Sequence, residues 1–172
     1  LCTRDPHPGR LARTLLGLRA QTLPGTEWET LLVDNGSTPP LQLAALPPHP
    51  ANVRLVSEPI PGLTPARLAG IAAARGELLV FVDDDNVLAP DFLAHAWKAF
   101  AADGDLTAAG GPVHPEFESP PPAWTQEFHS LLALRDLGAQ ILRATGGPSA
   151  SWPSFAPVGA GLCIRRAAAQ RY

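Results

Sequence analysis

Three consecutive aspartates, Asp83, Asp84 and Asp85, follow directly after the apolar run LLVFV at 78–82. An apolar run of this length, opening after a glycine, is typical of a strand buried on both faces inside a parallel sheet. Adjacent carboxylates repel one another, and each is unfavourable to desolvate unless a cation lies nearby. Carboxylate oxygens favour hard divalent ions such as Mg²⁺, Mn²⁺ or Ca²⁺. The sequence therefore predicts a metal site at the end of this strand.

The spacing also predicts how the three side chains point. If the extended geometry continues past the strand, Asp83 and Asp85 lie on one face and Asp84 on the other, because strand side chains alternate. The pair that shares a face is then the expected metal clamp. The alternative is an acidic turn that only solvates the strand end, and a motif this short does not decide between the two.

A second acidic group follows another predicted strand, TLLV at 30–33, which ends in Asp34-Asn35-Gly36-Ser37. Because ligands of open α/β sheets bind at the carboxyl ends of the strands, we expect Asp34 to lie near the aspartates and to accept hydrogen bonds from a ribose or a base. The alternative is a solvated turn acid. The sequence contains neither the Gly-x-Gly-x-x-Gly nor the Gly-x4-Gly-Lys-Ser/Thr phosphate motif. Phosphates would therefore be held by the metal and an arginine, for which Arg67 is best placed.

Strands alternate with helices along the first two thirds of the chain, which predicts an α/β fold with a mostly parallel sheet. After Gly110-Gly111 come a proline-rich loop, a helical stretch and a glycine-containing strand. The expected helices are 9–23, 65–76 with Thr64 as N-cap, 90–102 and about 124–134. The expected strands are the end of one at 1–4, then 30–33, 52–56, 78–82, 106–109 and 158–164.

The bulk composition narrows the class of protein. A net charge of -3 gives no global positive field, so we expect no nucleic-acid partner. No apolar run reaches the ~18 residues of a membrane span, so we expect no transmembrane segment in this chain. The two cysteines, Cys2 and Cys163, lie in apolar settings and are predicted to be free thiols. We expect a cytoplasmic location, with peripheral attachment to the inner face of the membrane as the alternative.

Five short motifs, in this order and spacing, resemble those of glycosyltransferase family 2, over most of the stretch from Leu1 to about Gly111. The resemblance implies a GT-A nucleotide-diphospho-sugar transferase fold, which is Rossmann-like with helices flanking a mostly parallel sheet, and a sugar transfer with inversion. The motifs are CTR at 2–4, LVDNGST at 32–38, GLTPARLAG at 62–70, ARGE at 74–77 and FVDDD at 81–85.

The resemblance also implies roles for the nucleotide-binding residues. By position, Thr3 and Arg4 line the nucleotide pocket, Asp34 contacts the base or ribose, and Arg67 lies near the base or a phosphate. The segment Gly159-Ala160-Gly161 resembles the family segment beside the donor sugar.

The same resemblance implies roles for the three aspartates. The last acid, Asp85, is expected to hold the metal, Mn²⁺ or Mg²⁺, with Asp83 as the second candidate ligand. Asp83 or Asp84 reaches the ribose and the metal-bound waters, and the triple aspartate leaves both registers open.

The resemblance assigns no catalytic residue within the chain. An inverting transfer needs a carboxylate that removes the proton of the acceptor hydroxyl, and in the family this acid follows the glycine-rich strand. We therefore expect the base beyond Tyr172, and we expect the chain to be a truncated enzyme, with a donor-binding half at 1–111 and the start of an acceptor-binding half at 112–172. The substitute carboxylates within the chain are Glu116, Glu118 and Glu127.

The expected partners are a nucleotide-diphospho-sugar and a glycan or lipid-linked acceptor. A UDP-sugar is the first expectation, with GDP and dTDP open, and the family points to cell-surface glycan or glycolipid synthesis. One rival enzyme is a haloacid-dehalogenase-like phosphotransferase, because DDDNV at 83–87 fits its D-x-D-x-[TV] motif. That enzyme class carries the motif on its first strand, whereas here it follows about the fourth. The other rival is a non-catalytic module that binds a nucleotide sugar or a metal.

Overall fold

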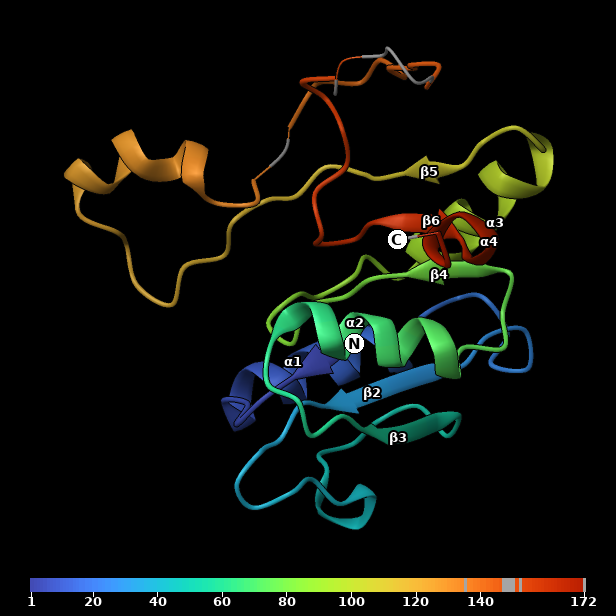
Figure 1. Cartoon of the computed structure of the whole chain (residues 1–172). Coiled ribbons are helices and arrows are strands. Elements are labelled where there is room, and N and C mark those ends of the chain that lie inside the picture. Colours follow the sequence, from blue (N-terminus) through green and yellow to red (C-terminus); the bar gives the residue numbers. More distant parts are fainter. Residues whose placement is uncertain (135, 147–150, 152, 172) are drawn as a thin grey trace.

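The computed structural model describes residues 1–134, 136–146, 151 and 153–171. Two small sheets and flanking helices form the body, and a long segment after β5 leaves it before β6 returns (Figure 1). The strands are β1 (Cys2–Thr3), β2 (Thr30–Asp34), β3 (Val53–Ser57), β4 (Leu78–Val80), β5 (Ala108–Ala109) and β6 (Cys163–Arg165); the helices are α1 (Pro8–Arg19), α2 (Leu63–Ala73), α3 (Phe92–Ala102) and α4 (Arg166–Ala169), with 3₁₀ turns η1 (Leu43–Ala45) and η2 (Ala123–Leu131).

The first sheet is parallel, in the order β1-β2-β3. Cys2 and Thr3 pair with Val33 and Asp34, and β2 pairs with β3 along its full length. The helix α1 connects β1 to β2, a longer connection with the 3₁₀ turn η1 leads from β2 to β3, and α2 follows β3 and leads to β4. The α/β prediction is confirmed.

The strand before the aspartates differs from the expectation. We predicted a fully buried strand inside a parallel sheet, but β4 pairs antiparallel with β6, in a second sheet of order β4-β6-β5. All three residues of β4 are only partly buried. One isolated parallel bridge, between Cys2 and Asp83, joins β1 to the chain just after β4. The apolar run predicted burial but could not reveal its partner, because parallel and antiparallel interior strands can have the same composition.

The core lies where α1 packs against the parallel sheet. Leu11, Leu15 and Leu18 recur at helical spacing and are buried together with Leu32 of β2. Full burial of one leucine stabilises a fold by about 1.5–3 kcal/mol, so this cluster is a major contribution to stability. The helix α2 lies close to β2, since a Cβ built on Gly70 would sit 3.3 Å from Cγ2 of Val33.

Several predicted boundaries were wrong in detail. The helix α2 begins at Leu63 after Gly62, which has φ +133°, and not after Thr64. The predicted helix near Trp124 is the 3₁₀ segment η2, and the predicted strand at 158–164 is reduced to β6. The strand β6 comes after residue 111, yet it lies between β4 and β5 in the second sheet. The two predicted halves of the chain therefore share this sheet. In the part of the chain that the structure describes, no helix is long and apolar enough to cross a membrane.

Candidate functional site

The carboxyl ends of β1 and β2 meet the acidic turn at one edge of the fold. Thr3 lies opposite Asp34 in the parallel ladder, and Cys2 bridges to Asp83. These pairings bring together residues from three distant parts of the sequence. The predicted convergence of the acidic groups at one edge is therefore confirmed by the backbone.

The three aspartates do not keep the alternation of a strand. β4 ends at Val80, and Asp84 and Asp85 form a turn. Asn86 closes this turn, because its N–H donates to the Asp83 carbonyl at 3.1 Å. Extended geometry does not continue past Asp83, so the condition under which Asp83 and Asp85 would share one face is not met. The three carboxylates instead have three different surroundings.

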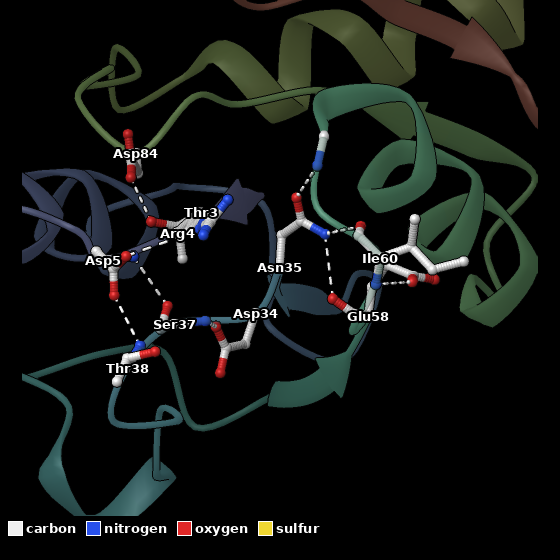
Figure 2. Close-up of polar contacts among 11 residues, drawn as sticks. Thr3, Arg4, Asp5, Asp34, Asn35, Ser37, Thr38, Glu58, Ile60 and Asp84 are labelled. Carbon is white, nitrogen blue, oxygen red and sulfur yellow. Dashed lines mark hydrogen bonds and ion pairs between the residues drawn. The ribbon is translucent and has the colours of Figure 1, made fainter.

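Asp84 faces β1. Its carboxylate accepts a hydrogen bond from the Thr3 hydroxyl, as Figure 2 shows. Thr3 is buried, whereas the neighbouring Arg4 is exposed and, among the described residues, has one long ion pair, of 3.8 Å with Asp5. Thr3 therefore orients the acidic turn, while the Arg4 guanidinium remains accessible to a ligand.

Asp83 faces Arg67 of α2. Its Oδ1 lies 3.8 Å from Nη2 of Arg67, whose guanidinium also stacks over the Phe81 ring at 5.3 Å from the centroid. Burial raises the pKa of Asp83, Arg67 opposes this rise, and the charges of Asp85 and Asp84 add to it. A carboxylate with a raised pKa beside two other acids marks a place where a further cation would be stabilising.

Asp85 is exposed and lines a polar cleft of about 370 Å³ between α1 and the segment after β5. The two walls are joined by exposed ion pairs, Arg10 to Glu118 at 3.0 Å and Arg13 to Glu116 at 2.6 Å. Two of the three substitute carboxylates therefore lie in the same cleft as Asp85. The third, Glu127, is exposed on η2.

Asp34 lies below the surface, with 4% of its area exposed. Its two carboxylate oxygens accept the N–H groups of Ser37 at 3.0 Å and Leu41 at 2.9 Å. Burial alone would raise the pKa of Asp34, but the hydrogen bonds from Ser37 and Leu41 outweigh it and lower the pKa. The carboxylate therefore holds the 37–41 loop. Direct contact with a base or ribose stays a prediction.

Asn35 is a structural residue that sequence reasoning missed. Its amide donates to the carbonyls of Glu58 and Ile60 at 3.1 and 2.7 Å, and its Oδ1 accepts the N–H of Gly62 at 2.7 Å (Figure 2). It thereby ties the end of β2 to the loop that leads into α2, which carries Arg67. The sequence feature that could have indicated this role is an amide side chain at a strand end, which we interpreted only as a turn residue.

We expect Asn35→Ala to lower the free energy of unfolding by about 2–3 kcal/mol, because three partners in a part-buried network lose their hydrogen bonds. Urea denaturation measures this. Asn86→Ala is a matched control, since the Asn86 side chain makes two weak hydrogen bonds of 3.4 Å with the residues that the structure describes and no others. Equal small losses in both variants would contradict the role given to Asn35.

The aspartates fit a divalent metal only if a substrate completes its coordination. Among the described residues no group of three His, Cys, Asp or Glu side chains converges as a ligand set. Mg²⁺ is commonly held by one or two carboxylates together with substrate phosphates. Asp83 and Asp85 have the right donor atoms for such a shared site, and they do not form a closed protein cage.

Three known proteins show what this chain is similar to. The succinoglycan biosynthesis protein ExoM of Rhizobium meliloti is 28% identical over 141 residues, which are 78% of this chain and 44% of ExoM. The mannosyltransferase PcManGT from Pyrobaculum calidifontis, solved in complex with GDP-Man and Mn²⁺, has a TM-score of 0.50 at 24% identity, over 62% of this chain and 32% of that one. TarS of S. aureus has a TM-score of 0.48 at 22% identity, over 67% of this chain and 36% of its own.

The structural likeness to the mannosyltransferase confirms the GT-A fold that the resemblance implied. The chain spans less than half the length of ExoM and of both solved structures. The family model of glycosyl transferase family 2 matches residues 4–171. This range includes every predicted site residue except Thr3. The match leaves no support for the haloacid-dehalogenase-like alternative. Because this match covers almost the whole sequence, the chain belongs to glycosyltransferase family 2.

Proposed function

We propose that this chain is the donor-binding part of a glycosyltransferase that moves a sugar from a nucleotide-diphospho-sugar to a glycan or lipid-linked acceptor. The observation that carries the proposal is the convergence at one sheet edge of Thr3, the acidic turn and Arg67, which bears accessible donors beside the acids. An edge that joins carboxylates to a guanidinium suits a metal-bound diphosphate, since the metal needs oxygen ligands and the phosphates need N–H donors. We also propose that residues 1–111 form the donor-binding half and that residues 112–172 begin an acceptor-binding half.

We assign the residues as follows. Asp85 and Asp83 hold Mn²⁺ or Mg²⁺, which neutralises charge on the departing diphosphate when bound. Arg67 donates to a phosphate oxygen, and the exposed Arg4 lines the nucleotide pocket. Asp84 contacts the ribose from its position beside Thr3.

Transfer with inversion is the second part of the proposal. It requires a base on the acceptor side of the anomeric carbon, and we place this base outside the described residues. Glu116 and Glu118 lie in the cleft beside Asp85, but each is already paired with an arginine. We therefore assign them to the wall of the acceptor entrance.

The names of the similar proteins guide the choice of substrates. ExoM is named for succinoglycan biosynthesis, which supports a polysaccharide precursor as the acceptor. The mannosyltransferase was solved with GDP-Man and Mn²⁺, so GDP-sugars stand beside the UDP-sugars that we first expected.

We expect calorimetry to show binding of UDP or GDP in the presence of Mn²⁺ and little binding after EDTA treatment. The physical reason is that a diphosphate and the acidic turn repel each other until a divalent cation lies between them. Adding dTDP and AMP to the panel tests the base and the need for a diphosphate. A folded protein that binds none of these nucleotides with Mn²⁺ present would contradict the proposal. Binding without transfer by the full-length protein would favour the non-catalytic module.

A further inference from the structure

The guanidinium of Arg67 contacts both an aromatic ring and a glycine. Its Cζ lies 5.3 Å from the centroid of Phe81, which follows β4. At the Nη edge of the guanidinium, a Cβ built on Gly159 would lie 2.5 Å from Nη2, 3.4 Å from Cζ and 3.5 Å from Nη1 of Arg67. Real Cβ atoms are essentially never found closer than 3.0 Å to another heavy atom. The guanidinium therefore occupies the space that any side chain at position 159 would need, and we call Phe81 and Gly159 the Arg67 seat.

The backbone gives Gly159 no other reason to be a glycine. Its φ lies outside the left-handed region, in contrast to Gly161 with φ +74°. An alanine at position 159 is thus compatible with the local backbone, and the atoms it would displace are the flexible end of one side chain. We therefore expect Gly159→Ala to fold and to move the Arg67 guanidinium rather than the chain.

The seat holds Arg67 with unused donors. Within the described residues, Arg67 takes part in one ion pair of 3.8 Å with Asp83, and none of its five N–H groups makes a hydrogen bond. Arg165 shows the contrast, because its Nε and Nη2 groups donate to the carbonyls of Leu106, Phe100 and Asp103 and so serve the fold. The Arg67 side chain is 29% exposed, so its donors remain open to a ligand at the acidic edge.

We propose that Gly159 is a positioning residue, whose missing side chain fixes the Arg67 guanidinium at the acidic turn for contact with the diphosphate of the donor. The inference deepens the proposed function and rests on it for the identity of the ligand. The segment before β6 thus affects phosphate binding through Arg67, without contacting the phosphate itself.

A double-mutant cycle tests this coupling. The ligand is inorganic pyrophosphate with Mn²⁺, which presents a diphosphate and leaves out the base and the sugar. We expect Gly159→Ala and Arg67→Ala each to weaken binding on the order of 10-fold, the size of one charge-assisted hydrogen bond. In the Arg67→Ala background, Gly159→Ala should cause no further loss, because the two changes remove one interaction. Gly104→Ala is the matched control, since a Cβ there has no neighbour within 4 Å.

Two results would overturn the inference. One is wild-type affinity in Gly159→Ala, and the other is an equal loss from Gly159→Ala when Arg67 is already absent. A merely structural role for Gly159 would produce the second result, because damage to the fold does not depend on Arg67.

A second measurement separates this inference from the proposed function. In the free protein, we expect the Phe81 ring current to shift the NMR resonance of the Arg67 Nε–H group, because the guanidinium lies over the ring. Gly159→Ala should move that resonance toward its position in Phe81→Leu, and Gly104→Ala should leave it in place. If the wild-type protein binds neither pyrophosphate nor any nucleotide, the proposed function fails, and the NMR result alone decides the inference. An unchanged resonance in Gly159→Ala would overturn it.

Discussion

Asp85→Ala is expected to weaken Mn²⁺-dependent binding of a nucleoside diphosphate by at least about 100-fold, or about 2.8 kcal/mol, because the variant removes a ligand from the metal that would carry the phosphates. Asp85 is the exposed acid of the turn and lines the cleft between α1 and the segment after β5. In the part of the chain that the structure describes, its carboxylate makes no ion pair and accepts one weak hydrogen bond, from the Asn86 amide at 3.4 Å. Its loss should therefore cost binding and leave stability unchanged.

Calorimetric titrations of wild type, Asp85→Ala and Asp83→Ala with UDP or GDP and Mn²⁺ measure this effect. Asp105→Ala is the matched control, since Asp105 is also an exposed acid in a turn. If Asp85→Ala kept the full nucleotide affinity and Asp83→Ala lost most of it, Asp83 and not Asp85 would be the main metal ligand. That result would contradict our assignment, which follows the resemblance in making the last acid of the motif, Asp85, the main metal ligand.

Asp34→Ala should lower the free energy of unfolding by about 3–5 kcal/mol, since two backbone N–H groups lose a charged acceptor in a buried place. Such a loss is a large share of the 5–15 kcal/mol that typically stabilises a domain. Urea denaturation with a two-state fit measures it. If the loss were within about 0.5 kcal/mol, the size of an ordinary surface substitution, Asp34 would not be holding the 37–41 loop.

The pH dependence gives an independent check on Asp34. Its pKa is lowered in the fold, so the carboxylate contributes stability above its ordinary pKa, and this contribution is lost as the pH falls through the folded pKa. Asp34→Asn keeps the shape and removes the charge. We therefore expect the stability difference between wild type and Asp34→Asn to be largest near neutral pH and to shrink in acid. A difference that is constant with pH would show that the charge of Asp34 does not matter.

The local sequence determined the chemistry of this protein and most of its elements. The leucines of α1 recur at helical spacing and are buried, and the predicted strands at 30–33 and 52–56 form β2 and β3, which pair in parallel as the α/β pattern predicted. The acids at two strand ends were expected at one edge, and they meet there although β2 and β4 lie in different sheets, because the parallel bridge between Cys2 and Asp83 joins β1 to the chain just after β4. The motifs that carry this pattern also led to the correct family.

The partners of these elements were decided only by the tertiary structure. β4 is apolar enough for a parallel interior strand, yet it pairs with β6, which lies more than eighty residues later. The divergence of the three aspartates depends on where that pairing ends, and composition does not mark this point. Gly159 looks in the sequence like any strand glycine, and its meaning follows from the side chain that fills its space, Arg67. Periodicity and residue type are local properties and can be read along the chain, whereas contacts between distant segments exist only after the chain has folded.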